Sequence, residues 1–255
     1  VKGSVPNFGT ITSPFTGSYE LLKFRISQLM PSVRFVPKGA KWSISETSGP
    51  NSPLATFGMV LDAFAYIAFP KQAYNLIRLM ISQKAYGLCV WFIWLMLWGL
   101  VWFPICKLLG SNLNIGRISH FEEGGGKVRV IGVVDAWSQM TLHRTHDYLY
   151  DILKRIEQDG TYNQVKPLHL LMDKVRLNNS PVFSYDLSAA TDRLPLATQI
   201  EALSSLGCPW ATWVGRVLSD RPWLSDIGYI RYSVGQPMGA YSSWALLACT
   251  HHMIV

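Results

Sequence analysis

The fold assignment rests on the stretch Tyr185-Asp186-Leu187-Ser188-Ala189-Ala190-Thr191-Asp192-Arg193, which places two carboxylates around a loop of small side chains. Residues 182–186 are mostly apolar and predict a short strand, so the carboxylate of Asp186 should emerge at its C-terminal end. This position suits a hard divalent cation such as Mg²⁺ or Mn²⁺, because hard cations prefer oxygen ligands. Asp192 precedes a helix predicted over residues 194–206, so it can also serve as a helix N-cap. These two carboxylates alone do not decide between a metal site and ordinary structural roles.

Two cations lie upstream, on a strand predicted over residues 127–131. Lys127 and Arg129 occupy alternate positions and should therefore point to the same side, directly after the three glycines at 124–126. An Arg fork beside a Lys point charge can hold a triphosphate. The sequence contains no G-x-x-x-x-G-K-[ST] pattern, so this is not a P-loop. The alternative is a solvated hairpin strand with ordinary surface charges.

A third segment, Gly235-Gln-Pro-Met-Gly239, lies between a strand predicted over residues 229–234 and an apolar terminal helix predicted from Trp244. Its two glycines allow a ligand or a template to approach the backbone closely. Hydroxyl groups follow at Ser242, Ser243 and Thr250. Taken alone, the segment could equally be a glycine-containing loop that binds nothing.

The order of the three segments is more informative than any one of them. G-G-G-K-V-R, then D-L-S-A-A-T-D-R, then G-Q-P-M-G-A-Y-S-S-W closely resembles the RNA-dependent RNA polymerases of mitoviruses. In polymerase terms the segments are similar to motif F of the fingers and motifs A and B of the palm. The resemblance covers residues 121–255. It implies an α+β fold, namely part of a right-hand polymerase with finger elements and the first half of the palm.

The resemblance also implies a role for each candidate residue. Asp186 would be catalytic and would ligate the Mg²⁺ (or Mn²⁺) ions, and Asp192 would recognise the ribose 2′-hydroxyl. Lys127 and Arg129 would hold the phosphates of the incoming nucleotide. The residues that position the template and the nucleotide would belong to motif B, namely Gly239, Ser242, Ser243 and Thr250.

The expected reaction is RNA-templated RNA synthesis by two-metal nucleotidyl transfer, with an RNA template, an RNA product and nucleoside triphosphates as partners and the host mitochondrion as location. No obligate protein partner is expected. The family's Gly-Asp-Asp motif C should follow motif B, but it does not occur before Val255, so residues 1–255 are expected to be inactive alone. One alternative is a captured, non-catalytic remnant of a polymerase gene. Another is a reverse transcriptase, which would carry a bulky side chain in place of Asp192.

The net charge of +7 divides the chain unevenly. Residues 1–115 carry ten Lys and Arg against three Asp and Glu, residues 116–180 carry nine against eight, and residues 181–255 carry four against five. A basic region beside a carboxylate site suits a polyanionic template. We expect residues 1–115 to form a largely helical N-terminal region, residues 116–180 a fingers segment, and residues 181–255 a partial palm.

The apolar run at residues 85–106 contains no charged residue and is bounded by Lys84 and Lys107. Its 22 residues are enough to cross a bilayer, for which about 20 are needed. However, Trp94 and Trp98 fall in the middle of the run, whereas tryptophans of spanning helices gather at the two interfaces. A buried or interfacial helix is therefore slightly favoured over a span, and association with a mitochondrial membrane stays open.

The remaining predictions concern histidines, cysteines and helices. His143 and His146 are expected on a helix surface rather than as ligands. The four cysteines form no C-x-x-C pair, so a disulfide framework or a zinc knuckle is not expected. The other predicted helices cover residues 19–30, 54–69, 72–83 and 136–158.

Overall fold

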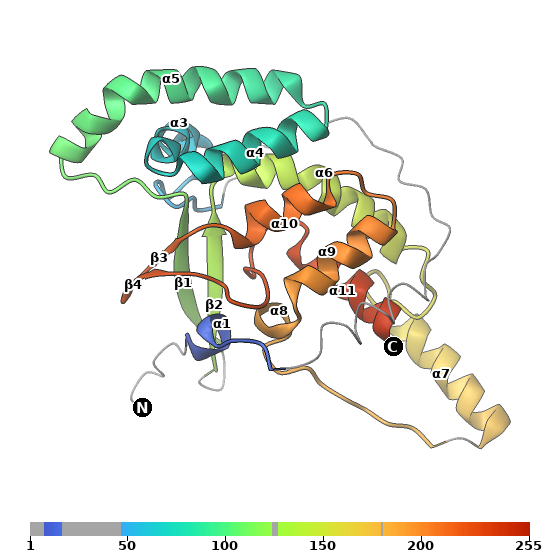
Figure 1. Ribbon diagram of the computed structural model, residues 1–255. Coiled ribbons are helices and arrows are strands. Elements are labelled where there is room, and N and C mark those ends of the chain that lie inside the picture. The colour runs from blue at the N-terminus through green and yellow to red at the C-terminus, as the bar shows by residue number, and fades with distance from the viewer. Residues whose placement is uncertain (1–7, 17–46, 124–126, 180) are drawn as a thin grey trace.

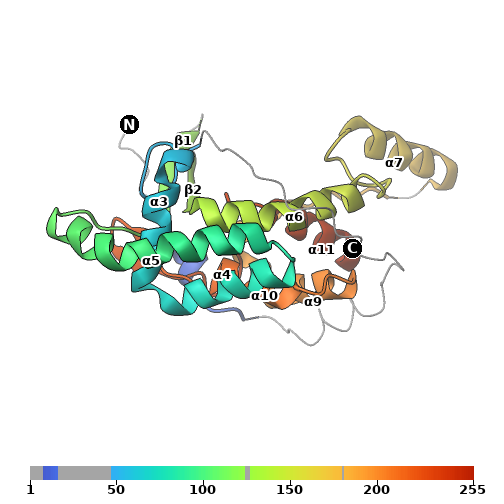
Figure 2. The same cartoon turned by 90° about the horizontal axis from the view of Figure 1, so that it is seen from above.

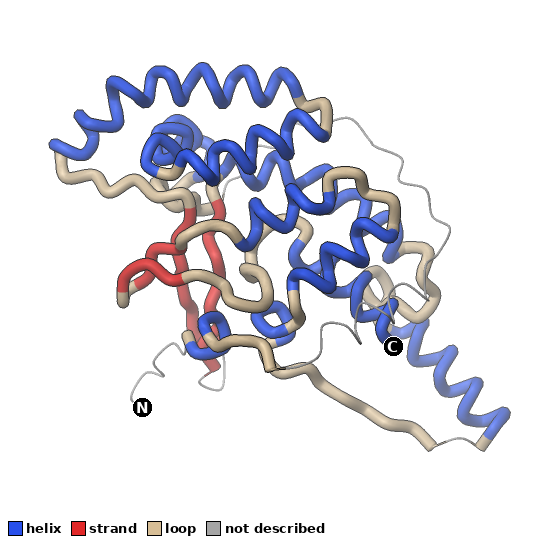
Figure 3. Tube along the Cα trace, viewed as in Figure 1, coloured by secondary structure: helices blue, strands red, loops and turns tan. Residues whose placement is uncertain are grey.

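A four-stranded mixed sheet with helices packed around it makes up the fold in the computed structural model (Figures 1 and 3). The structure describes residues 8–16, 47–123, 127–179 and 181–255. The predicted α+β class is confirmed. The helix predicted over residues 19–30 lies outside the described residues.

The sheet joins two hairpins that are far apart in the sequence. Strands β1 (Gly116–Glu123) and β2 (Lys127–Val134) pair antiparallel, as do β3 (Trp223–Ser225) and β4 (Gly228–Ile230). A parallel bridge between Arg117 and Leu224 connects them in the order β2-β1-β3-β4. The predicted strand at 127–131 is therefore confirmed and is longer than expected, whereas the strand predicted at 229–234 ends at Ile230.

Three helices and a short 3-10 turn form a layer beside the sheet. They are α3 (Ala55–Ala65), η1 (Tyr66–Ala68), α4 (Pro70–Ser82) and α5 (Tyr86–Leu108). In Figures 1 and 2, α5 runs beside α4 and crosses over α3 on the outside of the molecule. These helices follow the predicted ranges within a few residues, and the proline that begins α4 stands in the first turn, where a missing N–H costs nothing.

A second group of helices packs on the other side of the core. It contains α6 (Ala136–Leu153), α9 (Leu196–Ser205), α10 (Ala211–Ser219) and the terminal α11 (Ser243–Ile254). All but α10 were predicted, although α6 is five residues shorter than its predicted range. The hydrophobic core is continuous through residues such as Phe92, Trp137, Leu149, Trp223 and Leu246. It therefore runs through all three predicted segments of the chain, and their division into separate units stays a prediction.

Three further helices lie at the edge of this body. Single turns at α1 (Gly9–Thr12) and α8 (Ala190–Arg193) contact one another. Helix α7 (Val165–Asn178) has no buried residue and projects from the molecule in Figure 2. It was not predicted from the sequence.

The strand predicted at residues 182–186 is wrong. Residues 181–187 form an extended, exposed segment without regular structure, and none of the described strands pairs with it. An apolar, β-favouring composition produces a strand only where a neighbouring strand supplies the backbone hydrogen bonds. Tyr185, for example, is 87% exposed.

Candidate active site

Backbone hydrogen bonds bring the three predicted segments together. The amide of Gly132 on β2 donates to the carbonyl of Met238 (2.7 Å), which joins β2 to the glycine loop (residues 235–239). The amide of Gly235 donates to the carbonyl of Asp192 (2.9 Å), and that of Gln236 donates to the carbonyl of Thr191 (2.9 Å). The order of motifs in the sequence thus corresponds to direct contact in the fold.

Glycine is required where these backbones meet. A Cβ atom on Gly235 would overlap the backbone of Thr191 and Asp192, so no side chain fits there. Gly239 has φ +113°, a conformation that disfavours other residues, and its Cβ would lie 2.8 Å from the carbonyl oxygen of Gly132. At both glycines the group in close contact is the protein's own backbone, and the approach of a ligand or template stays a prediction.

A cleft of about 490 Å³ opens beside this junction. Its wall combines Arg129 of β2, Asp186 of the extended segment, Asp192 of α8 and Met238 of the glycine loop. A cation and two carboxylates thus face one cavity, although they come from three separate parts of the chain. This arrangement can hold a polyanion together with a divalent cation.

Asp192 is held inside this cleft rather than at a helix end. Its Oδ2 accepts a hydrogen bond from the Thr10 hydroxyl (2.8 Å), and burial raises the pKa of its carboxyl above the ordinary value. It lies within α8, whereas the N-cap of α9 is Pro195, with no side-chain cap. The N-cap interpretation is therefore wrong.

Asp186 is exposed in the cleft and forms no hydrogen bond or ion pair with any described residue. Its oxygen atoms are hard donors, which suits Mg²⁺. The described residues contain no group of three or more His, Cys, Asp or Glu able to hold a metal ion. Mg²⁺ usually keeps several waters and binds through one or two carboxylates plus substrate phosphates, so this donor set fits a magnesium ion bound together with a nucleotide.

The cations of β2 sit in a hairpin. Arg129 lies opposite Phe121 in the ladder, and its Nε forms an ion pair with Glu123 at the end of β1. The hairpin interpretation of this segment is thus confirmed, but Arg129 also lines the cleft. An incoming phosphate would compete with Glu123 for the guanidinium. Lys127 begins β2, and its side chain lies outside the described part of the structure.

The predicted hydroxyls separate into two groups. Ser242 and Ser243 line a second cavity of about 370 Å³ that shares Thr191 and Met238 with the cleft. Both serines are buried, and neither hydroxyl oxygen has a hydrogen-bond partner among the described residues. Thr250, in contrast, is fully buried in α11 and donates to the carbonyl of Leu246 (2.7 Å), so the structure does not bring it to either cavity.

Helix α6 holds the glycine loop through residues that the sequence did not reveal. Gln139 donates to the carbonyl of Gly239 (2.9 Å) and accepts from the amide of Tyr241 (2.7 Å). His146 accepts from the amide of Ser242 (3.3 Å). Burial, and then the nearby His143, lower the pKa of His146, which favours the neutral ring that accepts this bond. Both histidines, expected on the helix surface, are partly buried, and His146 holds the backbone at Ser242.

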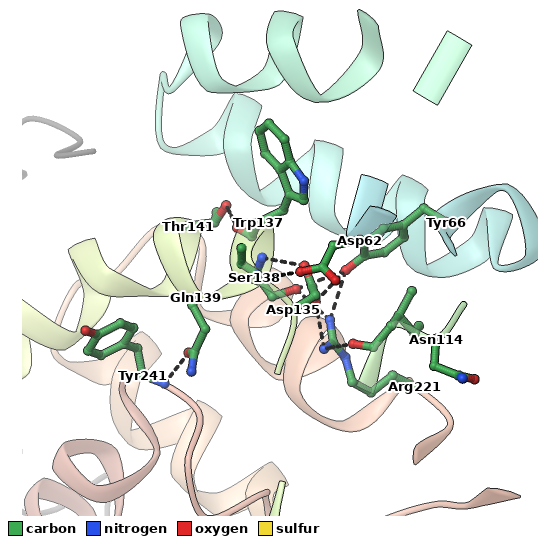
Figure 4. Close-up of polar contacts among 12 residues, drawn as sticks. Asp62, Tyr66, Asn114, Asp135, Trp137, Ser138, Gln139, Thr141, Arg221 and Tyr241 are labelled. Carbon is green, nitrogen blue, oxygen red and sulfur yellow. Dashed lines mark hydrogen bonds and ion pairs between the residues drawn. The ribbon is translucent and has the colours of Figure 1, made fainter. Parts of the chain in front are cut away.

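A buried polar cluster fixes the start of α6 (Figure 4). Asp135 caps the helix by accepting from the Ser138 amide (2.9 Å), while its other oxygen accepts from Arg221 and from the Tyr66 hydroxyl (both 3.0 Å). Asp62 accepts from the Ala136 amide (2.9 Å). The cluster lies one turn before Gln139, so it sets where the loop-holding side of α6 points.

Two buried acids lie near a single buried cation. Asp62 and Asp135 are both fully buried, and Arg221, also buried, forms its ion pair with Asp135. Burial, and then the charge of Asp135, raise the pKa of Asp62 to about 7. Sequence gives no signal for this cluster, since Tyr66 and Arg221 are 155 positions apart and an isolated Asp or Arg is ordinarily a surface residue.

Comparison with known proteins identifies a family and several relatives. The sequence profile of the family described as mitovirus RNA-dependent RNA polymerase matches residues 35–255. The RNA-directed RNA polymerase of Cryphonectria parasitica mitovirus 1 is 32% identical over 262 aligned residues, which include 98% of this chain. The chain spans about a third (32%) of the length of that relative.

Two mitochondrial proteins of Arabidopsis thaliana, both described as uncharacterized, are also similar. One is 38% identical over 41% of this chain and 43% of its own length. The other is 28% identical over 40% of this chain and 52% of its own length. No solved structure matches the chain significantly.

Proposed function

This chain belongs to the family of mitovirus RNA-dependent RNA polymerases, and from that premise we propose that it supplies the nucleotide and template site of an enzyme that copies RNA into RNA. One observation carries the proposal. Arg129, Asp186 and Asp192 face one cleft whose walls are joined by backbone hydrogen bonds between the three motif segments.

The architecture we propose is part of a right-hand polymerase. The hairpin of β1 and β2 would belong to the fingers (residues 116–180), and residues 181–255 would form the first half of the palm. Residues 1–115 would form an N-terminal region. The support is the contact of motif F with motif B at Gly132 and of motif A with motif B at Gly235, since catalysis needs all three around one nucleotide.

Each residue then has a stated task. Arg129 and Lys127 would bind the triphosphate, with Arg129 exchanging Glu123 for a phosphate. Asp186 would hold Mg²⁺, which when bound neutralises phosphate charge and favours attack by the 3′-hydroxyl. Asp192 would accept a hydrogen bond from the ribose 2′-hydroxyl, held in place by Thr10.

The loop would meet the template and the nucleotide through the buried hydroxyls of Ser242 and Ser243. Thr250 has no part in this proposal, because its hydroxyl is bonded within α11. RNA and nucleoside triphosphates are the proposed partners. A mitochondrial location is supported by the mitovirus relative and the two mitochondrial proteins of Arabidopsis.

Nucleotide binding by the purified chain tests the core of this proposal. With a fluorescent ATP analogue and Mg²⁺, Arg129→Ala should raise Kd about tenfold or more, because charge-assisted hydrogen bonds to phosphate are lost. The matched control is Arg176→Ala on the projecting α7, which should leave Kd unchanged. Equal Kd values for Arg129→Ala and the wild type would refute the phosphate clamp.

The sugar preference separates RNA synthesis from reverse transcription. In a longer polymerase that contains this chain, the wild type should incorporate ribonucleotides in preference to deoxynucleotides. Asp192→Ala should lower ribonucleotide incorporation about tenfold and leave deoxynucleotide incorporation less affected, because only the ribose hydroxyl is lost as a partner. A wild-type preference for deoxynucleotides would favour the reverse-transcriptase alternative, and no incorporation of either would favour a non-catalytic remnant.

A further inference from the structure

The outer face of α5 is an exposed apolar surface that the proposed function does not use. Within the described residues, α5 is the helix long and apolar enough to cross a membrane. Only Leu88, Cys89, Phe92 and Gly99 along it are buried. Large apolar side chains such as Val90 and Leu97 are 66% and 59% exposed, so water would otherwise face an unbroken apolar strip.

The packing of α5 argues against a helix that crosses the bilayer. Phe92 packs edge-on against Tyr66 in the core, with ring centroids 5.1 Å apart, and Gly99 allows the helix to approach Phe64. Its neighbour α4 carries Lys71, which is paired with Asp220 at 2.8 Å, and Arg78. Crossing would either tear α5 from this core or draw the charges of α4 into hydrocarbon, which is costly.

The tryptophans fit a helix that lies flat. Trp91, Trp94, Trp98 and Trp102 are spaced three or four residues apart, so they follow one stripe, and all four are between 47% and 52% exposed. In a spanning helix the two central rings would sit at the bilayer midplane, away from the interfaces that tryptophan prefers. In a helix parallel to the surface, all four rings lie at the same interfacial depth.

The charges around α5 complete the pattern. Lys84 and Lys107 flank the apolar run, and both are exposed. Basic residues at the edge of an apolar helix face attract anionic lipid headgroups. The outer face of α5 is therefore an apolar strip with a stripe of tryptophans and a lysine at each end.

We propose that α5 attaches the protein to an anionic bilayer surface, lying in the plane of the membrane with its tryptophan stripe at the level of the headgroups and acyl chains. The occupant of this face is lipid, and the cleft described above remains outside the membrane. This inference stands independently of the polymerase activity.

Vesicle binding tests the surface. The purified chain should float with vesicles of phosphatidylcholine and phosphatidylglycerol. Leu97→Asp combined with Val101→Asp should reduce the partition coefficient about tenfold or more, because burying each such side chain is worth roughly that factor. The matched control places the same charges on the projecting α7, with Leu168→Asp and Leu177→Asp, and should bind as the wild type does. All four substituted residues are exposed, so circular dichroism should show folded proteins.

Depth distinguishes lying flat from crossing. Single cysteines at Val90, Leu97 and Ile105, labelled with a fluorophore in a Cys106→Ser background, should be quenched equally by lipids brominated at a shallow position. The other three cysteines are buried and remain unlabelled. In a span, Leu97 would lie about 10 Å deeper than the other two positions, and that result would overturn the proposal. The proposal would also be overturned if the wild type failed to float, or if the Leu97 and Val101 variant floated as well as the wild type. If the wild type self-associates and that variant does not, the face belongs to a second copy of the chain and not to lipid.

Discussion

At Gly235 the backbones of two motif segments touch, and the space for a side chain is missing. A Cβ atom there would overlap the carbonyl of Thr191. Gly235→Ala should therefore lower the free energy of unfolding by about 3 kcal/mol or more, because backbone has to move and the hydrogen bonds at Asp192 are strained. Urea denaturation followed by circular dichroism measures this change.

The control for this substitution is Gly87 in α5, where an added Cβ would meet nothing within 4 Å. Gly87→Ala should be neutral or stabilising by up to about 1 kcal/mol, because alanine favours a helix. If both substitutions have the same effect, the contact between the two segments is not as tight as the structure describes.

Residue chemistry was predictable where it is local and unpredictable where it depends on distant partners. Arg129, Asp186 and Asp192 were identified from their motifs, and they do face one cleft. The Thr10 hydroxyl that holds Asp192 is 182 positions away, so no local pattern points to it. Thr250 was chosen because it carries a hydroxyl near a motif. However, it lies one helical turn after Leu246, bonds to the carbonyl of that residue and faces the core.

At the scale of elements, the start of α6 depends on the protonation of a buried acid. The pKa of Asp62 is raised by burial, and then by Asp135, from 3.8 to about 7. The folded state thus holds this proton more tightly than the unfolded chain does. The stabilisation from Asp62 is complete below about pH 4 and is lost as the pH rises through about 7.

Asp62→Asn removes this titration, and its amide oxygen can still accept from the amide of Ala136. Between about pH 4 and pH 7, the free energy of unfolding of the variant, relative to the wild type, should rise with pH by at most about 1.4 kcal/mol per pH unit. Denaturation curves across this range measure the difference. Asp226→Asn, at a side chain that is 75% exposed, should run parallel to the wild type. A constant difference for Asp62→Asn would contradict the raised pKa.

Elements were predicted well where periodicity is strong. The apolar period of α4 and the uninterrupted apolar run of α5 gave bounds within a few residues. Short elements, and those that depend on a distant partner, were not predicted correctly. The nine-residue α10 and three-residue β3 carry too few periods to detect, and residues 182–186 have the composition of a strand but no partner among the described strands.

At the scale of the whole molecule, the sheet explains why motif order has structural meaning. The parallel bridge between β1 and β3 ties residue 117 to residue 224, and the bond from Gly132 to Met238 continues that junction into the site. The resemblance of three ordered motifs predicted that these regions meet. It did not predict which strands pair. That pairing joins residues 107 positions apart and depends on the packing of Trp223 against Gly116 and Gly132, which is visible only in the folded chain.

The charge of the whole chain leads to the last prediction. With a net charge of +7, equal to the excess carried by residues 1–115, the protein should bind single-stranded RNA mainly by releasing counterions. If about four phosphates are neutralised, a plot of log K against log salt concentration should have a slope of about −3, measured by fluorescence anisotropy. Arg129→Ala should make this slope shallower by about 0.7, whereas Arg176→Ala on α7 should not change it. Affinity that does not depend on salt would mean that RNA is held by stacking and base contacts, and the basic N-terminal region would then need a different explanation.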